Sequence, residues 1–372
     1  MNNLKRILAL VLALMMSFSL VACGGKEEAA QEETKTETTE NTEATTEETT
    51  EEEPVMTEEE ELEAMKKEPM YEEGFKYFLG ASNCTSDPYL ADSLGYFEKY
   101  GIKAEFFKGS AMLEALGTNA VQLACTHVAH ALVPASNGVN YVCVAGAMVG
   151  CQSLMVLADS PVQSTSDLIG KTIGIANGGI GGPDYNIVCR MFWFDGIDPL
   201  KDIEFKVVER AAQQAALESG ELDAVLLPDS YSYDMRKDGT LRVIRSITWD
   251  DDFQTEVCCA NYMNKDFIAE NPLMAKYITK ALLEVQAWGG ENPEEAVQKL
   301  LDDQIISGSF EKNLDCWNTM HWGEVTNGFT AKSLKGLIED YIEIGLITAT
   351  DDAEGLYKEF YTPLYDDGTM ED

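Results

Sequence analysis

A run of glycines between an apolar strand and a helix is the first stretch of this sequence that could hold a ligand. The expected strand covers 172–176, four glycines fall within 177–182, and Pro183 opens the helix. The first N–H groups of a helix have no partner within it, and glycines let a bound group approach the backbone. The pattern favours a binding loop formed by Asn177, Gly178 and Gly179, the alternative being a turn that only requires glycine.

The composition of this loop limits the ligands it can take. The glycine spacing does not fit G-x-G-x-x-G, and the lysine of a phosphate-binding P-loop is missing. Asp184 lies in the first turn of the expected helix, where its charge would repel a strongly anionic ligand. Neither a dinucleotide nor a nucleoside triphosphate is therefore expected here.

Histidine and cysteine residues offer two further kinds of chemistry. His127 and His130 are three residues apart, so they could share a helix face as metal ligands, or His127 could be an ordinary hydrogen-bonded histidine. Cys84 or Cys151 together with His127 could form a nucleophile and base pair, although no local motif supports this. We expect neither a metal nor a catalytic residue.

Aromatic and apolar residues recur at helical spacing in the second half of the chain. Apolar stripes over 275–288 and 334–342 predict helices that pack their stripes into the core. Trp193, Trp317 and Trp322 could stack on a ring-shaped ligand or serve in packing.

The chain has nine cysteines, and eight of them follow Cys23. An even set suggests disulfides outside the cytoplasm, but Cys125, Cys143 and Cys189 lie in apolar runs where cysteine serves as a small buried side chain. On a strand, the adjacent Cys258 and Cys259 would point to opposite faces.

The N-terminus resembles a bacterial lipoprotein signal. A basic start at Lys5 and Arg6 precedes a short apolar run, and Leu20 to Cys23 has the pattern of a lipobox. The resemblance implies a signal peptide over 1–22, lipid on Cys23 and a location outside the cytoplasmic membrane. An uncleaved anchor helix is the alternative. The next stretch, 23–68, is rich in Glu and Thr and predicts a disordered acidic tether. A net charge of −38 argues against nucleic acid as a partner.

From residue 69 onward, short strands alternate with helices. This order predicts α/β architecture, with parallel sheets covered by helices. We expect two lobes with a cleft between them, lobe 1 from 69–158 and 260–372 and lobe 2 from 159–259. Ligands of such sheets bind beyond the carboxyl ends of the strands. The expected strands are 76–80, 103–107, 121–125, 141–146, 153–158, 172–176, 205–209, 224–227 and 241–247.

Several ordered segments together resemble the solute-binding proteins of ABC importers for nitrate, sulfonate, taurine and thiamine-pyrimidine precursors. These segments are 91–102, 110–116, 167–175, 196–199 and 218–224. The resemblance implies the type II periplasmic-binding-protein fold, in which two α/β lobes close on a small solute. It also implies an ABC permease as partner, a monomer, no cofactor and no catalytic chemistry.

The resemblance also implies where the solute is held, because the family's contacts come from loops after successive strands. The corresponding residues are Ser82, Asn83, Cys84, Thr126, His127, Cys151, Gln152, Asn177, Gly178, Gly179 and Asp229. No Lys or Arg stands at these positions, while Asp87, Asp184 and Asp229 make the expected mouth acidic. This departure favours a neutral, zwitterionic or cationic solute over nitrate. The alternative function is a biosynthetic enzyme on the same fold, of the pyrimidine-forming type.

Overall fold

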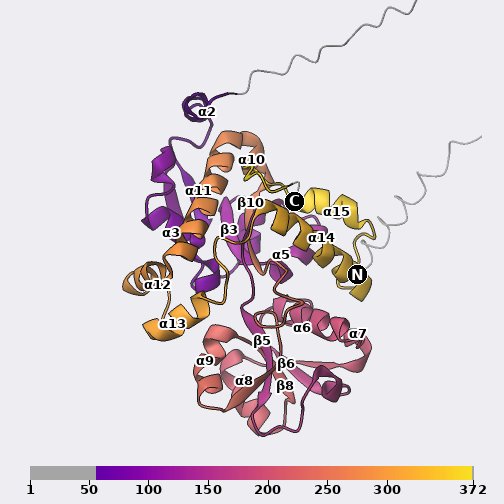
Figure 1. Cartoon of the computed structure of the whole chain (residues 1–372). Coiled ribbons are helices and arrows are strands. Elements are labelled where there is room, and N and C mark those ends of the chain that lie inside the picture. Colours follow the sequence, from indigo (N-terminus) through magenta and orange to yellow (C-terminus); the bar gives the residue numbers. More distant parts are fainter. Residues whose placement is uncertain (1–55, 371–372) are drawn as a thin grey trace, which may run out of the picture. The chain divides into compact units, whose positions relative to one another are not determined.

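The computed structural model describes residues 56–370, which form two five-stranded sheets with helices around them (Figure 1). The first sheet has the strand order β2-β1-β3-β10-β4. In this sheet β1 pairs in parallel with β2 and β3, whereas β10 runs antiparallel to β3 and β4. Its strands are β1 (Phe75–Phe78), β2 (Ala104–Phe107), β3 (Leu123–His127), β4 (Tyr141–Met148) and β10 (Cys259–Asn264).

The second sheet has the strand order β7-β6-β8-β5-β9. Here β6 pairs in parallel with β7 and β8, and β5 runs antiparallel to β8 and β9. Its strands are β5 (Gln152–Leu157), β6 (Thr172–Ile175), β7 (Glu204–Val207), β8 (Ala224–Pro228) and β9 (Leu241–Ser246). We call the two sheets with their helices lobe 1 and lobe 2. The residue boundaries of the lobes given above stay a prediction.

Both sheets are mixed, so the expectation of purely parallel sheets was wrong. The chain passes from lobe 1 to lobe 2 between β4 and β5 and returns between β9 and β10. The first strand after each passage is β5 in lobe 2 and β10 in lobe 1, and each runs antiparallel to the strands with which it pairs. The strand expected at 153–158 therefore pairs in the second sheet rather than the first. Residues 255–258 lead the chain back into β10.

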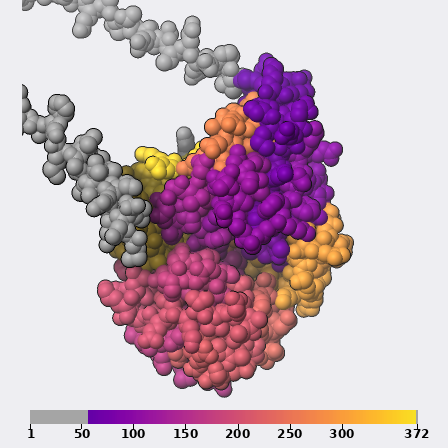
Figure 2. Space-filling view, turned by 180° about the vertical axis from the view of Figure 1, so that it is seen from behind, coloured from indigo at the N-terminus to yellow at the C-terminus, as the bar shows by residue number. Residues whose placement is uncertain are grey.

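Helices surround both sheets. Figure 2 shows segments from the two ends of the described chain together in the upper part and the middle of the chain in the lower part. The helices of lobe 2 are α6 (Pro183–Phe194), α7 (Pro199–Asp202), α8 (Arg210–Glu218) and α9 (Asp229–Lys237). The remaining helices are α2 (Glu58–Met65), α3 (Asp87–Ser93), α4 (Met112–Gly117), α5 (Val128–Ser136), α10 (Lys265–Glu270), α11 (Pro272–Glu291), α12 (Pro293–Asp302), α13 (Phe310–Trp317), α14 (Asn327–Ile344) and α15 (Ala353–Phe360).

The end of the expected tether is a helix that packs on the folded body. Thr57 and Glu60 form a capping box at the start of α2, and Glu61 accepts hydrogen bonds from Lys276 Nζ and Tyr277 OH of α11. Glu68 Oε1 and Oε2 accept the N–H groups of Leu273 and Met274 at 2.7 and 2.8 Å. The prediction that the chain is disordered as far as residue 68 was therefore wrong, because the carboxylates of Glu61 and Glu68 bond to groups of α11. The signal peptide, Cys23 and the rest of the tether lie outside the described residues.

The apolar stripes behave as expected. Ile278 and Leu282 of α11 and Leu334 and Ile338 of α14 are fully buried in the main core. This core continues from lobe 1 into lobe 2, while a smaller cluster lies between α8 and the second sheet. Between residues 56 and 370, no helix combines the length and apolar composition needed to cross a membrane.

Candidate functional site

Two adjoining cavities lie where loops of both lobes meet. The first, which we call the histidine cavity, has a volume of about 350 Å³. The second, the aspartate cavity, has a volume of about 210 Å³. Both are lined by Cys84, Cys151, Gln152 and Asn177. The histidine cavity also includes Thr85, Thr126, His127, His130, Gly178, Pro183 and Cys259. The aspartate cavity also includes Ser82, Asn83, Arg210, Pro228, Asp229, Ser230, Cys316, Thr319 and Met320.

The structure thus brings together ten of the eleven residues expected at the binding site. Gly179 is the exception, since it lines neither cavity. Whether the ten residues contact a solute stays a prediction. They meet because each lies at or just after the end of a strand or at a passage between the lobes, and the carboxyl ends of parallel strands share one edge of a sheet.

The glycine run reverses the chain between β6 and α6. Gly178 and Gly179 have φ of 73° and 65°, a left-handed conformation that glycine adopts without strain. The buried Asp184 carboxylate accepts the N–H groups of Ala176 and Asn177, both at 3.0 Å. The loop is therefore fixed from behind by Asp184 and presents Asn177 and Gly178 to the histidine cavity.

His127 ends β3 and caps α5. Its Nδ1 accepts the N–H of Ala129 at 2.9 Å, so the neutral ring carries its proton on Nε2. Burial lowers the pKa of His127, which keeps the ring neutral. Nε2 is buried and has no hydrogen-bond partner among residues 56–370. His127 therefore offers the cavity a single N–H donor. Its bonded Nδ1 and protonated Nε2 leave no free lone pair for a general base acting on Cys151.

His130 bonds to Thr126, with 3.1 Å between Nδ1 and Oγ1. The groups of described residues that could hold a metal ion include His127 with two cysteines but never His130. The idea of a shared helix face for His127 and His130 is therefore not supported. Trp317 stacks on Trp322 with ring centroids 4.9 Å apart, and no tryptophan lines either cavity.

Asp229 begins α9 at the aspartate cavity. Its Oδ1 accepts a hydrogen bond of 2.7 Å from Ser153, and its Oδ2 accepts one from Thr248. Burial raises the pKa of Asp229 to about 6 in spite of these bonds. Both oxygens are thus engaged within the protein, and the charge of Asp229 is sensitive to pH near neutrality.

Arg210 is a charged cavity-lining residue that sequence reasoning missed. It opens α8 just after β7 and lines the aspartate cavity, with Nη2 3.5 Å from Asp184 Oδ2. Its Nε is buried without a partner in the described part of the chain. A cation therefore lines the aspartate cavity, although none of the eleven predicted positions holds Lys or Arg. Arg210 also lies just after a strand, the same criterion that predicted the other residues at the site.

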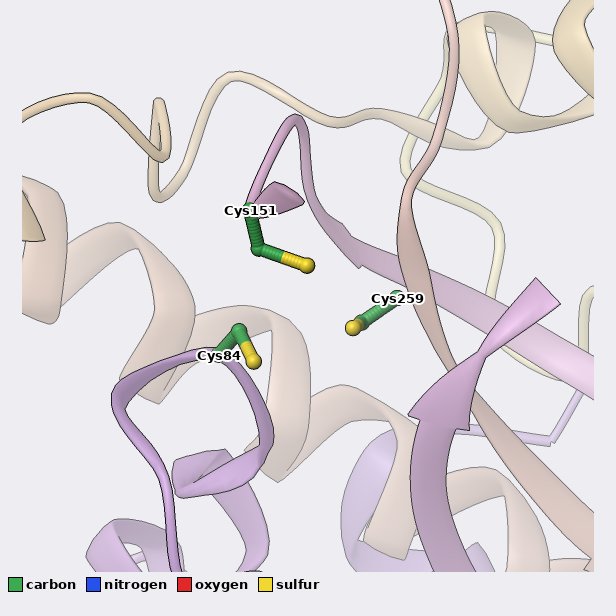
Figure 3. A group of neighbouring side chains, drawn as sticks. All are labelled: Cys84, Cys151 and Cys259. Carbon is green, nitrogen blue, oxygen red and sulfur yellow. The ribbon is translucent and has the colours of Figure 1, made fainter. Parts of the chain in front are cut away.

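Four cysteines meet beside the cavities, and two of them, Cys84 and Cys151, line both. Figure 3 shows the sulfurs of Cys84, Cys151 and Cys259 directed toward one another, and all three lie within 4.8 Å of one another. The Sγ of Cys258 is 3.2 Å from that of Cys151 and 4.0 Å from that of Cys259. Hydrogen bonds from Cys258, Cys259 and Cys84 lower the pKa of Cys151. All eight cysteines within residues 56–370 are free thiols.

The pattern of one protein family, described as NMT1/THI5 like, matches residues 85–296. The chain belongs to this family. No curated protein sequence matches the chain. The matched region contains both sheets except β1 and includes all of the cavity-lining residues between Thr85 and Ser230.

Solved structures with the same fold are similar to this NMT1/THI5-like protein at low sequence identity. The periplasmic aliphatic sulphonate binding protein of Escherichia coli is 18% identical, with a TM-score of 0.61 over 80% of this chain and 94% of that one. The periplasmic nitrate-binding protein of Synechocystis is 17% identical, with a TM-score of 0.61 over 77% and 86%. A Candida albicans protein with the generic periplasmic binding protein fold is 16% identical, with a TM-score of 0.62 over 79% and 98%. The predicted fold class is confirmed.

Proposed function

We propose that this NMT1/THI5-like protein is the extracytoplasmic solute-binding subunit of an ABC importer. Its two lobes close around a small polar solute and deliver it to the permease. The protein acts as a monomer and carries out no chemical step. Closure of the lobes is the change that the permease recognises.

The observation that carries this proposal is a set of buried polar atoms around the cavities. Arg210 Nε offers a donor, while Gln152 Oε1 and Asn83 Oδ1 offer acceptors, and none has a partner among the described residues. A buried polar atom left unpaired costs about 1–3 kcal/mol. A solute that supplies the missing partners recovers this free energy, so the cavities favour a ligand with both donors and acceptors.

The charges narrow the class of solute. Among the described residues lining the two cavities, Arg210 is the one cation, and it faces the carboxylate of Asp184. The proteins of similar structure that bind sulphonate and nitrate make an anionic group a reasonable ligand for Arg210. Nitrate, however, has no donor for Gln152. A zwitterionic sulfonate of the taurine type and an aminopyrimidine each have both hydrogen-bond donors and acceptors.

Calorimetric titration of the purified protein with taurine, alkanesulfonates, nitrate and aminopyrimidines tests this proposal. Gln152→Ala should weaken binding of the best ligand by about 1–3 kcal/mol, since it removes an acceptor that the solute satisfies. Gln298→Ala is the matched control, because Gln298 is exposed on α12 and lines neither cavity. Equal affinity in the two variants would show that the solute binds elsewhere.

The anchoring part of the proposal concerns Cys23. We infer cleavage after residue 22 and attachment of diacylglycerol to the new N-terminal cysteine. Metabolic labelling with palmitate should mark the wild type and leave the Cys23→Ser variant unlabelled. Label in both variants would contradict lipidation at this residue.

A pyrimidine-forming enzyme on the same fold is the second candidate. The feature that favours it is the Cys151 thiol at the wall of both cavities, because hydrogen bonds from Cys258, Cys259 and Cys84 lower its pKa and make it a stronger candidate nucleophile. Mass spectrometry of any ligand recovered after incubation distinguishes the two functions. An unchanged ligand supports the receptor, and a converted one supports the enzyme.

A further inference from the structure

Solute binding does not account for the cluster of Cys84, Cys151, Cys258 and Cys259, because thiols are weak hydrogen-bond partners and only two of the four line both cavities. Its members come from three separate parts of the chain. Cys84 lies in the loop after β1, Cys151 in the passage from β4 to β5, and the adjacent pair in the passage into β10. Local sequence does not force such distant residues together, so their convergence requires an explanation.

The backbone at the start of β10 directs both members of the pair to the same side. Cys258 precedes the strand, and the pairing of β10 with β4 shifts register between Cys259 and Ala260. The expected alternation of side chains therefore does not apply, and the two sulfurs are 4.0 Å apart rather than on opposite faces. Both cysteines of the pair are buried, while Cys84 and Cys151 are half-buried at the cavities.

The distances fit the coordination of a thiophilic cation. A d¹⁰ ion with metal–sulfur bonds of about 2.3 Å holds its sulfurs about 3.8–4.0 Å apart in tetrahedral or trigonal geometry. The sulfurs of Cys84, Cys151 and Cys259 are within 4.8 Å of one another, so each pair needs to move by at most about 1 Å to match this spacing. Soft thiolate ligands select Cu(I) and Zn²⁺ over Mg²⁺ or Ca²⁺.

We propose that Cys84, Cys151 and Cys259 bind one soft cation, Cu(I) or Zn²⁺, as thiolates, with Cys258 beside them as an additional sulfur ligand. Binding replaces the S–H bonds of the three thiols by metal–sulfur bonds and releases three protons to the solvent. No electron is transferred and no further reactant is needed. The site lies in the wall of the proposed solute cavities, but metal binding does not depend on the solute.

His127 supplies an independent argument for this site. A ring nitrogen of His127 lies within 4.8 Å of the sulfurs of Cys151 and Cys258. Because Nδ1 is bonded to Ala129, Nε2–H is the group left to donate, and it has no partner among residues 56–370. A metal-bound thiolate accepts hydrogen bonds far better than a thiol does, and such outer partners commonly orient metal ligands. Metal binding would therefore give this buried donor its partner, while His127 itself is not a ligand.

The position of the site has a mechanical consequence. Cys151 lies on the passage out of lobe 1, and Cys258 and Cys259 lie on the passage back. A cation bound to both passages and to the loop of Cys84 would fix the backbone on which the two lobes move. We therefore expect the metal to raise the melting temperature even without solute.

Metal binding can be measured on the full chain, reduced and handled without oxygen. Zn²⁺ and Cu(I) are each titrated in competition with a chromogenic chelator, and the bound metal is counted by mass spectrometry. The wild type should bind one equivalent, and Cys84→Ala should lower the affinity at least 100-fold. Cys84 is the first choice because it is half-buried and its truncation disturbs packing least. Cys189→Ala, at a buried thiol on α6 outside the cluster, is the matched control and should bind as the wild type does.

Three results would overturn the site: no metal bound by the reduced wild type, equal affinity in Cys84→Ala and Cys189→Ala, or a Cys151–Cys258 disulfide in protein isolated without reductant or oxygen. X-ray absorption of the loaded protein should show sulfur neighbours and no more than one nitrogen or oxygen ligand. Solute titration of the same variants separates the two proposals. If the wild type binds solute but no metal, the metal site alone is refuted. If it binds metal but no solute, only the solute receptor is refuted.

Discussion

The ion-pair network around Arg190 should be a main source of stability between the lobes. Arg190 lies on α6 of lobe 2, and its guanidinium bonds to Glu256 at 2.7 and 2.6 Å and to Asp340 of α14 at 2.7 Å. The Arg190 side chain is 6% exposed, and its two partners are 18% and 21% exposed. The network therefore joins a helix of lobe 2 to a helix of lobe 1 in a poorly hydrated place.

Arg190→Met keeps much of the aliphatic stem and removes the cation. It leaves two poorly hydrated carboxylates close together, and breaking such a pair costs about 3–5 kcal/mol. Because both carboxylates retain some contact with water, we expect a loss near the lower limit, about 3 kcal/mol. The guanidinium also lies 4.8 Å from the ring centroid of Phe194, and this contact is lost as well.

Urea unfolding at pH 7 measures this loss of free energy. Lys299→Met is the matched control, because Lys299 of α12 forms an exposed ion pair with Asp303, the residue just after this helix. Such a pair contributes only about 0.3–0.5 kcal/mol. A further variant, Arg190→Met with Glu256→Gln, should recover part of the loss by removing one unpaired charge. A loss in Arg190→Met no larger than in the control would refute the reasoning.

Three further changes probe the site and its supports. Burial raises the pKa of Asp229 from 3.8 to about 6, so the folded protein binds the Asp229 proton more tightly than the unfolded chain does. The resulting contribution to the free energy of unfolding is fully present below pH 3.8 and is lost as pH rises through 6. Asp229→Asn should therefore gain about 2 kcal/mol relative to wild type between pH 4 and 7.5 in urea unfolding, and a constant difference would contradict the raised pKa. Glu68→Ala should cost about 1–2 kcal/mol by the same measurement, because the first N–H groups of α11 lose their acceptor. An unchanged free energy of unfolding would contradict this role of Glu68. Gly290→Ala should lower the melting temperature by several degrees, as its Cβ would collide with the carbonyl oxygen of Trp322, and an unchanged value would contradict this packing.

Most of the α/β order could be predicted because each element carries its own signal. The strand at Thr172–Ile175 is apolar, α6 begins at a proline, and the stripes of α11 and α14 repeat at helical spacing. Sheet membership is different, because it depends on pairing between distant segments. β5 has the same apolar composition as a strand of either sheet, so nothing in residues 152–157 could assign it to lobe 2.

The candidate site was predictable to a similar extent. Loops that follow strands could be found from the sequence, and ten of the eleven residues chosen this way line the two cavities. Arg210 was missed although it also follows a strand. The docking of α2 was missed for a different reason. Its sequence is as acidic as the tether before it, and only the partners on α11, Lys276 and Tyr277, give its carboxylates a defined place.

The cysteine cluster marks the limit of reasoning from local pattern. Alternation along a strand places adjacent cysteines on opposite faces, and this rule holds only inside a regular ladder. Cys258 lies just before β10, where the chain arrives from the other lobe, and the register shift after Cys259 allows both sulfurs to approach Cys151. Because Cys151 lies on the opposite passage, the sulfurs can meet only when both passages are correctly formed. The group best suited to bind a soft cation is therefore formed by the two-lobed topology. Because its cysteines lie on both passages between the lobes, a bound cation would restrain both lobes.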